Sequence, residues 1–295
     1  MARRSSFWIL LLMCVAGTSA TGDRLVERVV ITVDRSDRHQ TILGWGADQS
    51  PTGEQMSTML DPYPVKLFDQ LYDDAVDVFG FNSLRILSHH HPPDRLWEPV
   101  NDNADPLVAD PAGFNFAWLD LVAQRDLLPL KRRVEANGER FHIYLSMGNF
   151  GPNGTPAWLQ NSPAEWAEYL FTAVKYLKEQ HAIDVASVAV INEPQFAAST
   201  YANAAFIAPI VKALGERMTQ AGYATRIQFP EAFDPRMAWQ LQIAPLRNDN
   251  DFWRHVGMIT YHKYGVDDPY PAAILEMAQA PGIPLGQTKQ HGPVA

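Results

Sequence analysis

A short apolar run over 188–191 ends in Asn192, Glu193 and Pro194, so a carboxylic acid directly follows a predicted strand. A polar pair is costly inside a core, but it is useful at the carboxyl end of a barrel strand, where substrates bind. Pro194 favours an end to the strand because proline has no N–H to continue the ladder. A strand followed by an ordinary turn would give the same pattern. We favour the interpretation that Glu193 is a general acid presented at a strand end.

Other polar and aromatic side chains follow predicted strands in the same way. Because the carboxyl ends of different barrel strands surround one pocket, residues far apart in the sequence are expected to line it together. Arginine and histidine near carboxylates can set their protonation, and tryptophan offers a flat apolar face to a sugar ring. The predicted pocket residues besides Glu193 are Arg85, Asn192, Trp45, Trp158, Glu231, His262 and Tyr264, with a carbohydrate as the expected ligand.

Several of these residues also have plainer interpretations. Glu231 would either orient a substrate or pair with Arg85, and Arg85 alone could merely tie strand ends together. His262 and Tyr264 alternate with their neighbours along the strand, so either they or those neighbours face the pocket. The tryptophans could be core aromatics, although nearby glycine and proline place them on loops.

Three adjacent histidines, His89, His90 and His91, raise the alternative of a metal-dependent hydrolase. Adjacent residues on an extended segment point to opposite faces, and no His-Glu-x-x-His helix accompanies them. We expect no metal and no organic cofactor, since acid/base and nucleophile chemistry at an acetal needs none.

The elements that must position these residues alternate between strands and helices. Short apolar or β-branched runs predict seven strands over 42–45, 83–87, 141–146, 188–191, 226–229, 258–261 and 283–288. Amphipathic stretches over 65–78, 164–180 and 204–221 predict helices between them. Parallel strands with crossover helices indicate an α/β fold, a (β/α) barrel. Ahead of these strands, apolar and polar residues alternate over 25–33, which predicts a half-buried strand of another sheet.

The composition fits one enzyme-sized domain. The chain of 295 residues, with 46% hydrophobic and 19% charged residues, is long enough for a barrel with a single core. Its formal net charge of −9 argues against nucleic acid, because no basic face would neutralise phosphates. The charge is compatible with a neutral substrate.

The N-terminus predicts a secretory signal peptide over 1–20, in which Arg3 and Arg4 precede an apolar run and small residues. The run is too short to span a bilayer, so no stable membrane anchor is expected. The single cysteine, Cys14, lies in this leader, and lipoprotein processing there is the alternative. We therefore expect a secreted or periplasmic protein without disulfides. The whole chain would comprise the leader over 1–20, an N-terminal strand segment over 21–40 and a barrel over 41–295.

These motifs resemble the retaining glycoside hydrolases of the (β/α)8-barrel clan with Asn-Glu-Pro acids, most closely glycoside hydrolase family 30. The matching segments occur in the family's order from Val29 onwards. They are Gly-Trp-Gly at 44–46, the arginine-bearing strand at 83–86, Pro-Ala-Trp at 156–158, Asn-Glu-Pro at 192–194 and His-x-Tyr at 262–264. The resemblance implies a glycosidase acting on β-linked glycosides or polysaccharides; the motifs specify neither the sugar nor the oligomeric state.

The resemblance also implies a double displacement. Glu193 would be the acid/base, and a second carboxylate on the seventh strand would be the nucleophile, about 5 to 5.5 Å away. Where the family has Thr-Glu, this chain has Thr288 and Lys289, so Lys289 occupies the expected nucleophile position. Lysine cannot form the glycosyl ester, and its charge would favour the ionised form of Glu193.

A second departure concerns the end of the chain. The family has an eighth βα unit and returning strands of a side β-sandwich after the seventh strand, so we expect a (β/α)8 barrel truncated there. The strand over 25–33 would belong to the mostly missing sandwich. A gene-fragment boundary or frame error near Lys289 would account for both departures. Two functions stay open: a secreted O-glycosidase in an impaired chain, and a non-catalytic carbohydrate-binding pseudoenzyme.

Overall fold

A computed structural model describes residues 41–49, 65–88, 97–148, 158–160, 162–197, 203–263, 270–279 and 282–289, with isolated positions 32, 34, 36, 37 and 156. The chain divides into two compact units, Met1–Thr41 and Ile42–Ala295. The predicted leader, nearly all of the strand over 25–33, the three adjacent histidines and Tyr264 lie outside the described residues. All helices and strands that the structure describes belong to the second unit.

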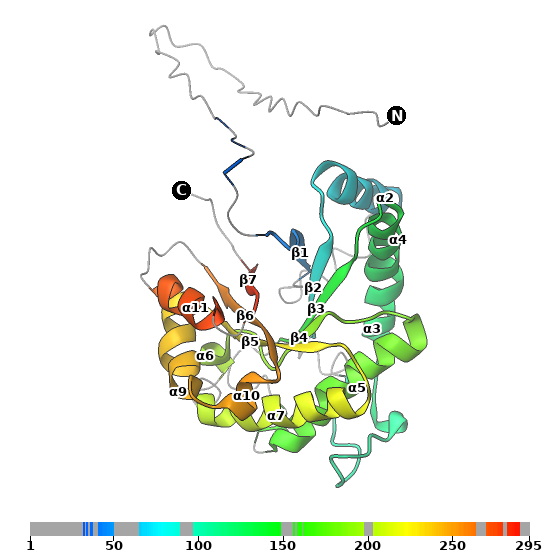
Figure 1. Cartoon of the computed structure of the whole chain (residues 1–295). Helices are drawn as coiled ribbons and strands as arrows, with labels where there is room; N and C mark the ends of the chain where they lie inside the picture. The colour runs from blue at the N-terminus through cyan, green and yellow to red at the C-terminus, as the bar shows by residue number, and fades with distance from the viewer. Residues whose placement is uncertain are drawn as a thin grey trace, which may run out of the picture. The chain divides into compact units, whose positions relative to one another are not determined.

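Seven parallel strands form a nearly closed barrel, in which each strand pairs with the next in chain order (Figure 1). The strands are β1 (Gly46–Gln49), β2 (Ser83–Ser88), β3 (His142–Met147), β4 (Ser187–Ala189), β5 (Arg226–Ala232), β6 (Val256–His262) and β7 (Leu285–Lys289). Among the described residues, β1 and β7 are the two edges of this sheet. The predicted class of fold is therefore confirmed.

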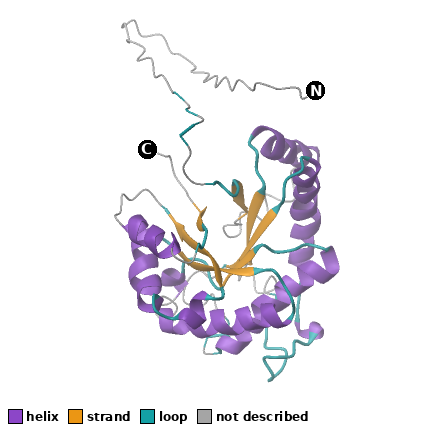
Figure 2. Cartoon of the chain, viewed as in Figure 1, coloured by secondary structure: helices purple, strands orange, loops and turns teal. Residues whose placement is uncertain are grey.

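Helices surround the strands on the outside (Figure 2). They are α2 (Val65–Asp73), α3 (Ala117–Val122), α4 (Leu128–Ala136), α5 (Pro163–His181), α6 (Pro194–Ala197), α7 (Ala204–Gln220), α8 (Pro235–Met237), α9 (Ala244–Leu246), α10 (Asn250–Trp253) and α11 (Tyr270–Gln279). Three π-helical segments, η1 (Asp74–Val78), η4 (Ala123–Leu127) and η5 (Ala238–Ile243), and the 3-10 turn η3 (Pro111–Gly113) complete the set. The predicted helices over 65–78, 164–180 and 204–221 match α2 with η1, α5 and α7.

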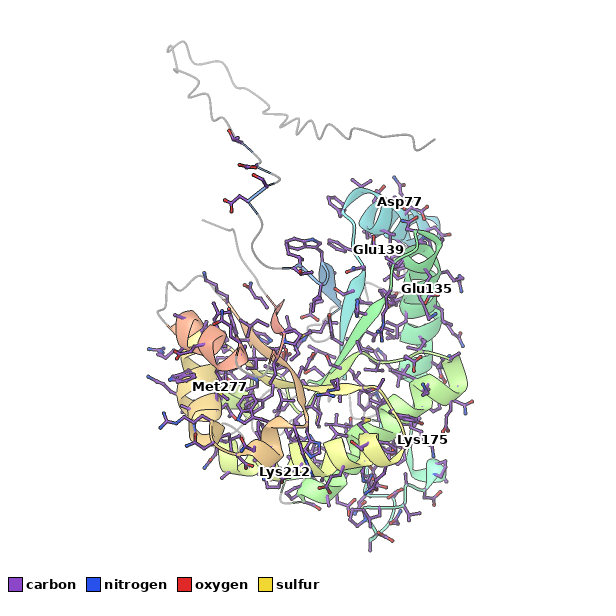
Figure 3. All side chains as sticks on the ribbon, in the orientation of Figure 1. Asp77, Glu135, Glu139, Lys175, Lys212 and Met277 are labelled. Atoms are coloured by element: carbon purple, nitrogen blue, oxygen red, sulfur yellow. The ribbon has the colours of Figure 1, made fainter. Side chains whose placement is uncertain are left out.

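The two long helices show why these sequences fold locally as they do. Pro163 opens α5 at a position where its missing N–H costs nothing, and Ala182 ends it with a left-handed φ of 53°. The side chain of Asn203 caps α7 by accepting a hydrogen bond from the Ala205 N–H at 2.9 Å. Charged residues lie on the outer side, as Lys175 of α5 and Lys212 of α7 illustrate (Figure 3).

The core lies between the strands and these helices. Apolar side chains of alternate strand positions and of the inner helix faces are fully buried together, which is the largest stabilising contribution that this fold has. Among them are Ile86, Leu145, Val188, Trp166, Leu214 and Ile259. In the described part of the chain, no helix is both long and apolar enough to cross a bilayer.

The first strand differs from the prediction over 42–45. Ile42 and Leu43 are 54% and 55% exposed, so their apolar character does not mark a buried strand. Pairing begins instead at Gly46, which lies opposite Ser83. A Cβ on Gly46 would lie only 2.3 Å from the Ser83 carbonyl oxygen, so only glycine permits this close approach of β1 to β2.

This approach gives the first testable prediction. Gly46→Ala should lower the free energy of unfolding by about 1–3 kcal/mol, because backbone rather than a flexible side chain blocks the new methyl group. Urea unfolding followed by circular dichroism measures the change, with Ala47→Ser at the exposed next position as the control. Equal stability of Gly46→Ala and the parent chain would show that the β1–β2 contact is looser than described.

Candidate active site

A buried ion pair joins two opposite strands of the barrel. The Nε and Nη2 atoms of Arg85, on β2, donate to Glu231 Oε2, on β5, at 3.0 Å and 2.6 Å. Both side chains are almost completely buried, with exposed fractions of 2% and 0%. Arg85 Nη1 donates to Asp48 of β1 at 2.9 Å, and Nη2 donates also to the Asn192 side-chain oxygen at 2.6 Å. One arginine of β2 therefore ties together β1, β5 and the segment that follows β4.

The segment after β4 is bonded to its neighbours through the backbone as well. The Asn192 N–H donates to the Met147 carbonyl at 2.8 Å, and the Glu193 N–H donates to the Glu231 carbonyl at 2.9 Å. Both glutamates have left-handed backbones, with φ of 47° at Glu193 and 58° at Glu231. Such conformations cost a non-glycine residue about 1–3 kcal/mol and persist only where the surroundings enforce them, as they commonly do at functional sites.

His262, the last residue of β6, lies between the two glutamates. Its Nδ1 is 2.7 Å from Glu193 Oε1, and its Nε2 is 3.4 Å from Glu231 Oε2. The imidazole is fully buried. Each ring nitrogen thus faces one carboxyl group, which is the arrangement expected when a protonated imidazole bridges two acids.

The electrostatics separate the roles of these groups. Burial alone would raise the pKa of Glu231, but the charge of Arg85 and hydrogen bonds from His262 and Thr288 outweigh it and hold that pKa well below its usual range. Burial alone would lower the pKa of His262, but its bonds to Glu193 and Glu231 raise it above its usual value. Glu231 is therefore an ionised partner of the arginine at neutral pH, and His262 favours the charged form.

Two residues of the cluster were not among the predicted site residues. Asp48 follows Gly46 by two positions on β1, and its carboxylate pairs with Arg85. Thr288 precedes Lys289 on β7, and its hydroxyl donates to Glu231 Oε1. Both lie next to the last residue of their strands, so this place at the carboxyl end of a strand was the signal that could have identified them. Lys289 closes β7 and lies opposite His262 in the register of β6 and β7.

The structure brings together Arg85, Asn192, Glu193, Glu231 and His262 as predicted. Trp45 does not join them, because β1 begins after this residue: its carbonyl oxygen accepts from the N–H groups of Asn82 and Ser83 at the amino ends of the strands. Its side chain is 60% exposed.

Trp158 and Tyr264 are the remaining predicted site residues. Trp158 is half-buried and packs against the hydrophobic core, and its Nε1 has no hydrogen-bond partner within the described residues. Tyr264 and the three histidines are not described. Within the ranges given above, no group of three or more His, Cys, Asp or Glu side chains is arranged to hold a metal ion.

Comparison with known proteins gives structural matches only. No family model and no curated protein matches the chain. The solved structure of the endo-beta1,6-glucanase BT3312 matches with a TM-score of 0.59 and 21% identity, over 86% of this chain and 58% of that chain. The family 30 endoxylanase of Clostridium papyrosolvens C71 matches with a TM-score of 0.55 and 19% identity, over 83% and 56% of the two chains.

A third match is the subfamily 8 xylanase Xyn30A of family 30 from Clostridium acetobutylicum, with a TM-score of 0.52, 22% identity and coverage of 85% of this chain and 56% of that chain. The chain thus spans little more than half the length of these solved structures. At these identities the likeness concerns the fold. The chain has the barrel fold found in glycoside hydrolases of family 30. The predicted resemblance to that family is therefore confirmed for the fold.

The ion pair between Arg85 and Glu231 generates a prediction about stability in acid. A depressed pKa contributes stability that is present above the ordinary pKa of a glutamate and is lost as the pH falls below it. Glu231→Gln should lower the free energy of unfolding at neutral pH by about 3–5 kcal/mol, since it leaves a buried charge without its main partner. It should also flatten the loss of stability below about pH 4.5.

Thermal unfolding measured across this pH range tests both effects. Glu276→Gln, at an exposed position of α11, is the matched control and should behave as the parent chain does. A Glu231→Gln protein with parental stability at neutral pH would contradict the structural role given to this pair.

Proposed function

We propose that this protein is a secreted glycoside hydrolase that acts on β-linked glycosides or polysaccharides by a retaining, two-step mechanism. The observation that carries the proposal is the convergence of Glu193, Glu231 and His262 near the carboxyl ends of β4, β5 and β6, where Arg85 of β2 binds Glu231. Active sites of barrel enzymes occupy this end of the strands. The fold shared with a glucanase and two xylanases supports the same conclusion.

Glu193 is the proposed acid/base. In the first step its carboxyl proton passes to the leaving glycosidic oxygen as the bond to the anomeric carbon breaks. In the second step Glu193 takes a proton from the water that attacks the same carbon, which restores the starting state. His262 Nδ1, at 2.7 Å from Glu193 Oε1, positions the carboxyl group throughout.

Glu231 does not fit the role of nucleophile. Arg85 donates two hydrogen bonds to its Oε2, and the Thr288 hydroxyl donates to its Oε1. The side chain is fully buried. A carboxylate whose two oxygens are both held in this way is a poor attacking group, so we assign Glu231 to the positioning of Arg85 and His262.

Asn192 has one hydrogen-bonding group left for a ligand. Its Oδ1 accepts from Arg85 Nη2 at 2.6 Å, which fixes the orientation of the amide. Its Nδ2 is buried and has no hydrogen-bond partner within the part of the chain that the structure describes. A sugar hydroxyl is an acceptor that this N–H group could bind.

The nucleophile is the missing part. In the proposed mechanism a carboxylate at position 289 would attack the anomeric carbon, and the chain has Lys289 there. An ammonium or amine at this point cannot form the glycosyl ester and be released again by water. We therefore propose that turnover by this chain is impaired, and Lys289 is also the observation that favours the second candidate, a carbohydrate-binding protein without catalytic activity.

Restoring the carboxylate tests the proposal. Lys289→Glu should raise hydrolysis of aryl β-glycosides at least about 100-fold above the parent chain, and adding Glu193→Gln should lower it again by roughly 10²–10⁴-fold. Lys175→Glu makes the same charge change on the outer surface of α5 and should leave the rate unchanged (Figure 3). Circular dichroism confirms that each variant is folded.

The opposite outcome is equally definite. If folded Lys289→Glu remains inactive on every β-glycoside but the parent chain binds gluco- or xylo-oligosaccharides in titration calorimetry, the binding function replaces the catalytic one. If the variants show no activity and the parent chain binds no oligosaccharide, the carbohydrate assignment is wrong.

A further inference from the structure

Residues 97–116, which precede α3, pack on the outside of the barrel beside α5 (Figure 1). The first of them, Trp97, is fully buried and stacks on Tyr169 of α5 with ring centroids 5.1 Å apart. At the other end of this range, Phe116 stacks on Tyr176 of α5 at 4.1 Å. Residues 97–116, named here the α5 strap, are therefore attached to one helix at two aromatic contacts.

Three glutamates are buried at the first of these contacts. Glu98 belongs to the α5 strap, and Glu165 and Glu168 belong to α5. Their exposed fractions are 0%, 7% and 0%. None of the three takes part in the cluster around Glu193, and carboxyl groups are rarely placed so deeply without a partner.

Most of their oxygens have no donor. Glu98 Oε1 accepts from the Asp102 N–H at 2.9 Å. Within the described residues, Glu98 Oε2, Glu165 Oε2 and both oxygens of Glu168 are buried without a hydrogen-bond partner. An ionised carboxylate in this setting is strongly disfavoured, whereas a protonated carboxyl group carries its own donor.

The charges around the cluster add to this preference. Asp102 of the α5 strap adds negative charge near Glu98 and Glu168, and α7 contributes Arg217, on which the charge of Asp105 also acts. The Arg217 Nη2 atom is itself buried without a hydrogen-bond partner among the described residues, so it donates to none of these carboxyl groups. Positive charge therefore compensates the carboxylates only in part.

The ionisation of the cluster follows from these surroundings. Burial raises the pKa of Glu98 to about 7. Burial, the nearby carboxyl group of Glu165 and the charge of Asp102 raise the pKa of Glu168 to about 8, although Arg217 acts against them. Such carboxyl groups hold their protons in mildly acidic solution and lose them as the pH rises through these values.

We infer that Glu98 and Glu168, buried beside Glu165, form a proton-dependent contact that fixes the α5 strap to α5 and releases it when Glu98 and Glu168 ionise. A raised carboxyl pKa contributes stability that is present below the ordinary pKa of a glutamate and is lost as the pH rises through the folded-state pKa. The barrel core does not depend on these groups. The inference concerns a local opening of the α5 strap and does not rest on the proposed function.

Amide hydrogen exchange of the parent chain at about pH 5.5 and about pH 8.5, corrected for the intrinsic rates, measures this opening directly. Protection of residues 97–116 should fall at least about 10-fold at the higher pH, while β5 stays protected. In Glu98→Gln with Glu168→Gln, which cannot ionise, protection should be the same at both pH values. Glu276→Gln, exposed on α11, should keep the parental response.

Equal protection of the α5 strap at both pH values in the parent chain would overturn the inference, and this comparison needs no variant. The inference would also be overturned if folded Glu98→Gln with Glu168→Gln lost as much protection at the higher pH as the parent chain does. The opening would then depend on other groups.

Discussion

The ion pair between Arg85 and Glu231 is the interaction on which the rest of the site depends. The two residues stand on β2 and β5, which are not neighbours in the sheet, so the pair crosses the interior of the barrel. Both side chains are buried, and each would be costly without the other. The same guanidinium also holds Asp48 and Asn192, so one charge sets the distances between four strand ends.

This constraint divides the two buried acids into different roles. Glu231 is fully engaged by Arg85, His262 and Thr288 and remains ionised, which makes it part of the framework. Glu193, by contrast, keeps a small exposed fraction of 6% and is held by His262 and by its strained backbone. In the proposed mechanism, a fixed and charged framework holds the one acid that transfers a proton, as general acid catalysis needs.

Much of this arrangement could be predicted from the sequence, because the carboxyl ends of barrel strands meet at one edge. That rule alone placed Arg85, Glu193, Glu231 and His262 together. The rule did not place Trp45 correctly. The apolar residues Ile42 and Leu43 suggest a strand but are exposed, and strand pairing begins only at Gly46. The left-handed backbones of the two glutamates had no local signal, because tertiary contacts enforce them.

The central claim is that Glu193 faces a bound sugar at the carboxyl ends of the strands. A crystal structure of the chain soaked with gluco- and xylo-oligosaccharides tests it most directly. The account predicts a sugar ring with a glycosidic or anomeric oxygen within hydrogen-bond distance of Glu193 and a hydroxyl on the Asn192 amide. A sugar bound elsewhere on the barrel, with Glu193 still covered only by protein, would contradict it.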